Sequence, residues 1–107
     1  MVRGRPPKSV IRQNIVEILF LFDKAYGYQI DKIYNEIFPT VHQRSIYYHL
    51  KKGKSTGEIS IEEIKEEKGE FSWGNLVEKT YYQLGPNAQP KGDKRVNAYF
   101  RKWRKKK

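Results

Sequence analysis

Cysteine is absent from this chain of 107 residues, and long apolar runs are absent as well. Without thiols the protein forms neither disulfides nor thiolate metal sites, which fits a reducing compartment. No apolar stretch approaches the ~20 residues that a membrane-spanning helix needs. The N-terminal stretch MVRGRPPKSV also lacks the apolar segment of a secretory signal. The sequence therefore predicts a cytoplasmic protein with no membrane partner.

Groups that would carry out catalysis or bind metal are scarce. The two histidines, His42 and His49, lie seven positions apart without a neighbouring carboxylate, so metal binding is not expected. The paired glutamates at 62–63 and 66–67 fall where a strand and a loop are expected, and a solvated face is their ordinary role. The chain has no glycine-rich phosphate loop and no nucleophile elbow. We therefore expect no enzyme activity, no catalytic residue, no metal and no cofactor.

Acidic residues are nearly missing from both ends of the chain. Residues 1–12 carry four basic and no acidic side chains, and residues 91–107 carry nine basic side chains against one acidic. The middle, 13–90, has a net charge of −2, while the whole chain has +10. Tails of one sign attract phosphate, which predicts a polyanionic partner. The alternative is that the tails only aid solubility.

Apolar residues recur at helical spacing over three segments in the first half of the chain. Ser9 is a suitable N-cap for the first helix, and Gly53 is expected to end the third. Residues 23–27 are expected to form a turn. The three predicted helices span about 10–22, 27–37 and 42–52.

The apolar period changes from 3.6 to 2 at residue 59. A strand from residue 59, a loop over 66–75 and a returning strand over 76–84 predict a hairpin. A basic helix with Asp93 as its N-cap follows over about 93–105. The fold class is therefore mainly α with a small β-hairpin (α+β): three helices, a two-stranded wing and a C-terminal basic helix.

Three short helices followed by a hairpin form the winged-helix arrangement, and three segments of this chain resemble a family. The stretch IVEILFLFDKAYGYQIDKIY (15–34) is similar to the opening of PadR-like winged helix-turn-helix transcriptional regulators. SIYYHLKK (45–52) is similar to their recognition helix, and TYYQL (80–84) to their second wing strand. The resemblance implies a DNA-binding regulator. The chain departs at Gly53, where the family has an apolar residue, and at Gly85-Pro86 after the wing. It also lacks the long C-terminal dimerisation helices of larger members, so their ligand binding is not implied.

The third predicted helix has the composition of a DNA-reading element. With Ile46 and Leu50 turned inward, its other side carries polar and basic residues, and 40–57 holds four basic side chains and no acid. Arg44 and Gln43 suit base edges in the major groove, and the lysines suit phosphates. The alternative is a solvated helix face. The predicted DNA-binding residues here are Gln43, Arg44, Ser45, Tyr48, His49, Lys51, Lys52 and Lys54.

The N-terminal arm, residues 1–8, contains Arg3-Gly4-Arg5-Pro6, the core of an AT-hook. Arginines exploit the negative potential of a narrow A·T-rich minor groove, and Gly allows the backbone to approach closely. Lys8 suits a phosphate. The alternative is a disordered basic terminus.

The wing and the last helix are harder to assign to DNA. Residues 58–70 carry six glutamates, so either only the wing tip, with Lys68, approaches a phosphate, or the wing faces elsewhere. In the last helix an apolar stripe is expected to pack on the first helix or on a second copy. Packing on a second copy would give a two-fold homodimer, which would match a palindromic site. Binding of this basic helix to a membrane or to RNA is the alternative. The stripe consists of Val96, Tyr99, Phe100 and Trp103.

Together these patterns divide the chain into a basic arm (1–8), a winged-helix domain (9–86) and a basic C-terminal segment (87–107). We expect sequence-specific or A·T-preferring binding of double-stranded DNA by a nucleoid-associated regulator. An RNA-binding or ribosome-associated protein is one alternative, which the acidic wing favours slightly. A winged-helix adaptor that binds protein is the other.

Overall fold

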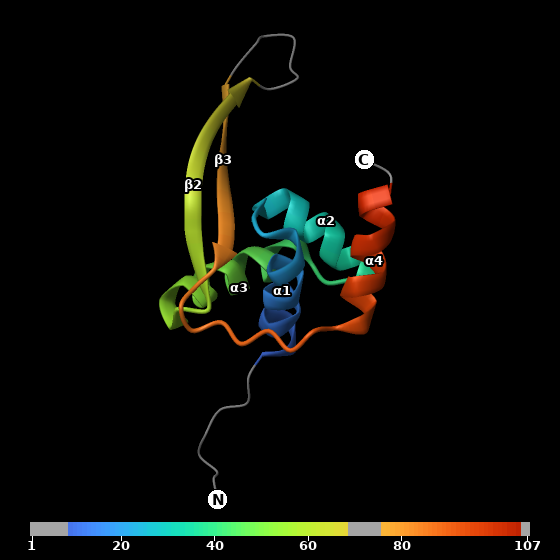
Figure 1. Ribbon diagram of the computed structural model, residues 1–107. Helices are drawn as coiled ribbons and strands as arrows, with labels where there is room; N and C mark the ends of the chain where they lie inside the picture. Colours follow the sequence, from blue (N-terminus) through green and yellow to red (C-terminus); the bar gives the residue numbers. More distant parts are fainter. Residues whose placement is uncertain (1–8, 69–75, 106–107) are drawn as a thin grey trace, which may run out of the picture.

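The computed structural model describes residues 9–68 and 76–105 (Figure 1). Helices and strands follow one another in the order that the hydrophobic periods predict, with one short strand added. The elements are α1 (Val10–Phe22), β1 (Ala25–Tyr26), α2 (Gly27–Ile37), α3 (Gln43–Thr56), β2 (Ile59–Lys68), β3 (Leu76–Leu84) and α4 (Lys94–Lys105).

The core lies among α1, α2 and α3. Ile15 and Ile18 of α1, Ile30 of α2, and Ile46 and Leu50 of α3 are all fully buried. Each of these residues falls on the apolar stripe of its helix, so burial of the stripes fixes how the three helices pack. The bounds predicted for the first two helices agree with α1 and α2.

The predicted end of the third helix at Gly53 is wrong, because α3 continues to Thr56. Gly53 is buried, and a Cβ atom there would lie 2.6 Å from Cδ1 of Ile59 on β2. The glycine therefore allows α3 and β2 to approach closely. The helix ends at Gly57, whose φ of 87° is the left-handed conformation that glycine adopts readily.

The wing is part of a three-stranded antiparallel sheet with the order β1-β3-β2. The segment expected to be only a turn contains β1, in which Ala25 pairs with Tyr82 and Tyr26 with Tyr81. Ala25 is fully buried, so this short strand ties the base of the wing to the helices. The strand β2 runs to Lys68, so it includes the first residues of the predicted loop.

The C-terminal helix α4 packs on α1, as one of the two sequence alternatives predicts. Phe22 of α1 contacts the rings of Phe100 and Trp103 at centroid distances of 4.9 and 4.8 Å. Asp93 caps the helix by accepting a hydrogen bond from the Arg95 N–H at 2.8 Å, which confirms its predicted role. Tyr99 donates a hydrogen bond to Glu36 of α2; burial and this carboxylate raise the pKa of Tyr99 to about 12.

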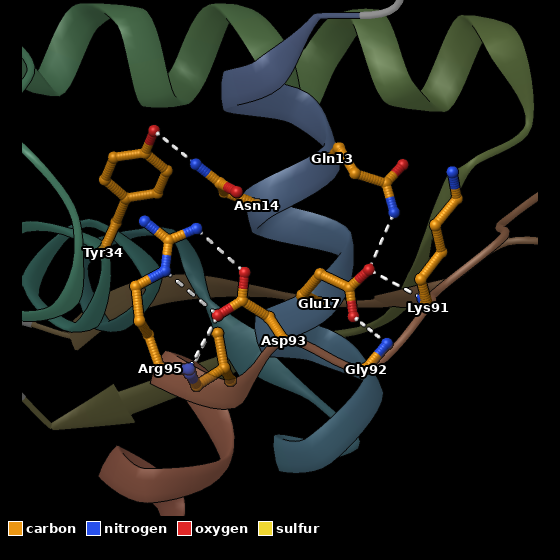
Figure 2. A network of polar contacts seen from close by, with 9 residues as sticks. Gln13, Asn14, Glu17, Tyr34, Lys91, Gly92, Asp93 and Arg95 are labelled. Atoms are coloured by element: carbon orange, nitrogen blue, oxygen red, sulfur yellow. Dashed lines mark hydrogen bonds and ion pairs between the residues drawn. The ribbon is translucent and has the colours of Figure 1, made fainter.

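The segment between the wing and α4 is held against α1 by a buried carboxylate (Figure 2). Glu17 is 5% exposed and accepts hydrogen bonds from the backbone N–H groups of Lys91 at 2.7 Å and Gly92 at 2.9 Å. The Gln13 side chain donates to the same carboxylate and to the Gln89 carbonyl oxygen. These contacts fix where α4 begins.

Over 9–68 and 76–105, no helix combines the length and the apolar composition needed to cross a membrane.

Candidate nucleic-acid interface

One side of α3 faces solvent and consists of polar, aromatic and basic side chains. Gln43, Arg44 and Tyr48 are exposed, and Tyr48 retains 58% of its surface. Because Ile46 and Leu50 anchor the opposite side in the core, the orientation of this exposed face is fixed. The face extends to the last turns of the helix through the exposed residues Lys51, Lys52 and Lys54.

The N-termini of α2 and α3 add positive potential beside this face. Neither helix has an acidic residue in its first turn, and neither N-cap residue makes a side-chain capping hydrogen bond. Unpaired N–H groups and the helix dipole attract anions at such ends. Tyr28, which is 54% exposed, lies in the first turn of α2, and the Tyr47 ring of α3 lies over Gly27.

Tyr28 and Tyr47 are not among the DNA-binding residues predicted from the sequence. Tyr28 belongs to the stretch 15–34, which indicated family resemblance rather than binding. Tyr47 is 41% exposed, and burial is the main cause that raises the pKa of its hydroxyl. Its contact with Gly27 joins two helices and has no local sequence signal.

His49 is partly buried and contacts α1 as well as belonging to α3. Its Nδ1 lies 3.4 Å from Nη1 of Arg12, and the Arg12 Nε donates to Glu58 at 2.7 Å. Burial, and then the Arg12 charge, lower the pKa of the His49 imidazole. The Thr56 hydroxyl also donates to Glu58 at 2.7 Å, so this cluster joins α1, α3 and the turn before β2.

The acidic wing is partly neutralised by a lysine from outside the hairpin. Lys24 pairs with Glu63 at 2.9 Å and with Glu62 at 3.4 Å, and Lys65 lies 3.6 Å from Glu63. The hydrogen bond from Lys24 is the main cause that lowers the pKa of Glu63, and the same bond raises the pKa of Lys24. These glutamates therefore hold β1 against the wing, which is a structural role.

The predicted site residues divide into two groups. All eight on the third helix lie on α3; Ser45 and His49 are partly buried, and the others are exposed. Arg3, Arg5 and Lys8 lie outside the described residues, as does the side chain of Lys68 at the end of β2. No group of three or more His, Cys, Asp or Glu side chains that could hold a metal ion occurs in the described ranges.

No family model and no curated protein matches this chain. Among solved structures, a PadR family transcription regulator from Clostridium difficile R20291 aligns with 92% of this chain and 86% of its own, at a TM-score of 0.52 and 21% identity. The chain has a PadR-like fold. Bacillus subtilis PadR, solved in complex with operator DNA, aligns with 89% of this chain at a TM-score of 0.53 and 20% identity. This chain spans 46% of that protein, and the shared PadR-like fold includes the hairpin as its wing.

Proposed function

We propose that this chain is a DNA-binding transcriptional regulator that places α3 in the major groove. The observation that carries the proposal is the solvent-facing side of α3, which a buried opposite side holds in one orientation. A major groove admits one α-helix and displays a pattern of donors and acceptors that side chains can read. The B. subtilis neighbour of the same fold, solved with operator DNA, supports the proposal.

The chemistry of each side chain assigns its part in this interface. Arg44 and Gln43, in the first turn of α3, read base edges. Lys51, Lys52 and Lys54 contact phosphates, as do the uncapped N-termini of α2 and α3. Ser45 and Tyr48 contact the sugar-phosphate backbone beside these lysines. His49, on the side of α3 that faces Arg12, contacts the same DNA backbone, and Lys68 contacts it from the wing.

The arm is proposed to add a preference for A·T-rich DNA. Arg3 and Arg5 would enter the minor groove and Lys8 would contact a phosphate. Deletion of residues 1–8 is expected to weaken binding to duplexes with A·T-rich flanks more than to duplexes with G·C-rich flanks. Equal loss on both flanks would show that the arm contributes charge alone.

The test of the proposal begins with selection of target duplexes from a random pool, followed by fluorescence anisotropy at two salt concentrations. Arg44→Ala is expected to weaken binding by about 1–3 kcal/mol and to relax the preference at the base that it reads. Lys94→Ala, which removes a charge from an exposed position at the start of α4, is the matched control and is expected to change the affinity less than about twofold. Unchanged affinity in Arg44→Ala would refute this placement of α3.

Competition distinguishes the alternative ligands. Structured RNA added at matched salt is expected to displace the selected duplex poorly. Efficient displacement would favour the RNA-binding interpretation, and no nucleic-acid binding at low salt would favour a protein-binding adaptor. The homodimer through α1 and the apolar stripe of α4 stays a prediction. Phe100 and Trp103 of the stripe contact Phe22 of the same chain, so these contacts do not test whether a second copy binds.

A further inference from the structure

The C-terminal half of α4 presents a second group of exposed cations, which we call the α4 basic face: Arg101, Lys102, Arg104 and Lys105. The helix contains no acidic residue, and none of the four cations forms an ion pair with any residue in the described part of the chain. The cation at the other end of α4 differs, because Arg95 pairs with Asp93 at 2.9 Å. Arg104 makes an aromatic contact instead, with its guanidinium carbon 5.7 Å from the centroid of the Phe100 ring.

The cations of the α4 basic face repel one another, and a bound anion would relieve that repulsion. Arg101 lies three residues from Arg104 and four from Lys105, and like charges at those spacings repel on a helix. The same three residues line an open surface hollow of about 300 Å³. Lys102, Arg104 and Lys105 lie in the last turn, where the helix dipole offsets part of this repulsion. A polyanion outside the chain would offset the rest.

The apolar side of α4 is already occupied, which limits what that polyanion can be. Val96 is fully buried, and Phe100 and Trp103 contact Phe22 of α1. Insertion into a bilayer would require α4 to leave α1. Binding therefore depends on the charged side alone, and duplex DNA, with one negative charge per ~1.7 Å of axis, has the complementary charge density.

The α4 basic face and the exposed face of α3 lie on different parts of the molecule. Helix α4 packs on α1 and α2, whereas α3 packs on α1, α2 and β2. In Figure 1, α3 and the base of the wing lie to one side of α1 and α4 lies to the other, with the C-terminal end of α4 pointing away from α3. Bending a duplex over 20–30 base pairs costs on the order of 1–6 kcal/mol, so a segment bound along α3 would contact that end only at an added cost.

We infer that the α4 basic face binds the phosphates of a second duplex segment, so that the protein bridges two stretches of DNA. This inference rests on the proposed function, in which α3 holds the first segment. Residues 101–105 cover about 6 Å of helix axis, and their long side chains contact neighbouring phosphates of one strand. The contacts are to phosphate only, so the second segment needs no particular sequence.

A capture assay with the full chain tests the inference. Beads carry the selected duplex, the protein is added to saturation, and capture of a second, labelled duplex of random sequence is measured at ~0.1 M salt. The variant is Arg101→Gln/Arg104→Gln, because glutamine is a good helix former. The control, Lys91→Gln/Lys94→Gln, removes the same charge from two exposed positions, one in the segment before α4 and one at its first residue. Circular dichroism checks that both retain the fold.

Capture by Arg101→Gln/Arg104→Gln is expected to fall about tenfold or more, as for loss of two phosphate contacts, while its affinity for the first duplex changes less than about twofold. The control is expected to capture as much of the second duplex as the unchanged protein does. Equal capture by both variants, or capture of anionic vesicles in preference to duplex, would overturn the inference and leave the proposed function standing. Absence of binding to the first duplex would instead overturn the proposed function.

Discussion

His49 links the exposed face of α3 to the start of α1, where its ring lies beside the Arg12 guanidinium. An unperturbed imidazole titrates near 6.5. In the folded protein burial and the Arg12 charge lower the pKa of His49, so the folded state binds a proton less readily than the unfolded state does. The stability that depends on neutral His49 is therefore complete above about pH 6.5 and decreases as the pH falls below it.

We expect His49→Gln to reduce the loss of stability between pH 7.5 and pH 5.5. Urea denaturation at both pH values measures the free energy of unfolding, and carboxylate titration contributes equally to both proteins. His42→Gln is the matched control, because His42 is exposed. It should lose as much stability as the unchanged protein. An identical loss in the His49 variant would show that its protonation is not coupled to folding.

At the scale of elements, the junction between α3 and β2 depends on the missing side chain of Gly53. The sequence alone predicts a helix end there, because glycine is a poor helix former and a common terminator. The helix instead continues through Gly53, where Ile59 of β2 packs closely against it. This contact joins two different elements, so no local sequence pattern predicts it. The end lies instead at Gly57, where the backbone requires a left-handed residue.

Gly53→Ala is expected to lower the free energy of unfolding by about 1–2 kcal/mol. The steric cost of placing a methyl group against Ile59 exceeds the free energy gained from the higher helix propensity of alanine. The double variant Gly53→Ala/Ile59→Val removes the Cδ1 atom closest to the new Cβ atom. It should cost less than the sum of the two single changes. Ser55→Ala, at an exposed position of the same helix, serves as the propensity control. Additive costs in this cycle would contradict the packing explanation.

The connection to α4 depends on Glu17, which receives two backbone N–H groups of the segment before that helix. Glu17→Ala leaves these donors without a partner and is expected to cost about 2–3 kcal/mol. Gln13→Ala removes one hydrogen bond to the Glu17 carboxylate and one to the Gln89 carbonyl oxygen but leaves both backbone donors paired, so a cost of about 1 kcal/mol is expected. In a Trp73→Phe background, the fluorescence of Trp103 reports whether α4 remains on Phe22. Equal costs for both variants would show that the Glu17 carboxylate has no special role.

At the scale of the whole molecule, the order of the elements follows from the sequence, and several of their contacts do not. Stripes such as Ile15 with Ile18 and Ile46 with Leu50 are local patterns, so the helices and the hairpin could be predicted. The strand β1 has two residues, too few to show a period, and its pairing with β3 is a long-range contact. The contact of His49 with Arg12 and that of Tyr47 with Gly27 also join distant segments.

Contact between the solvent-facing side of α3 and duplex DNA can be observed residue by residue through amide chemical-shift mapping by NMR. A selected duplex is titrated into the labelled protein, and the shifts at substoichiometric duplex are assigned to residues. The largest changes are expected over Gln43–Lys54 and at the N-terminus of α2, with smaller changes in the C-terminal half of α4. Changes confined to α4 or to the wing, with the α3 amides unmoved, would contradict the proposed contact.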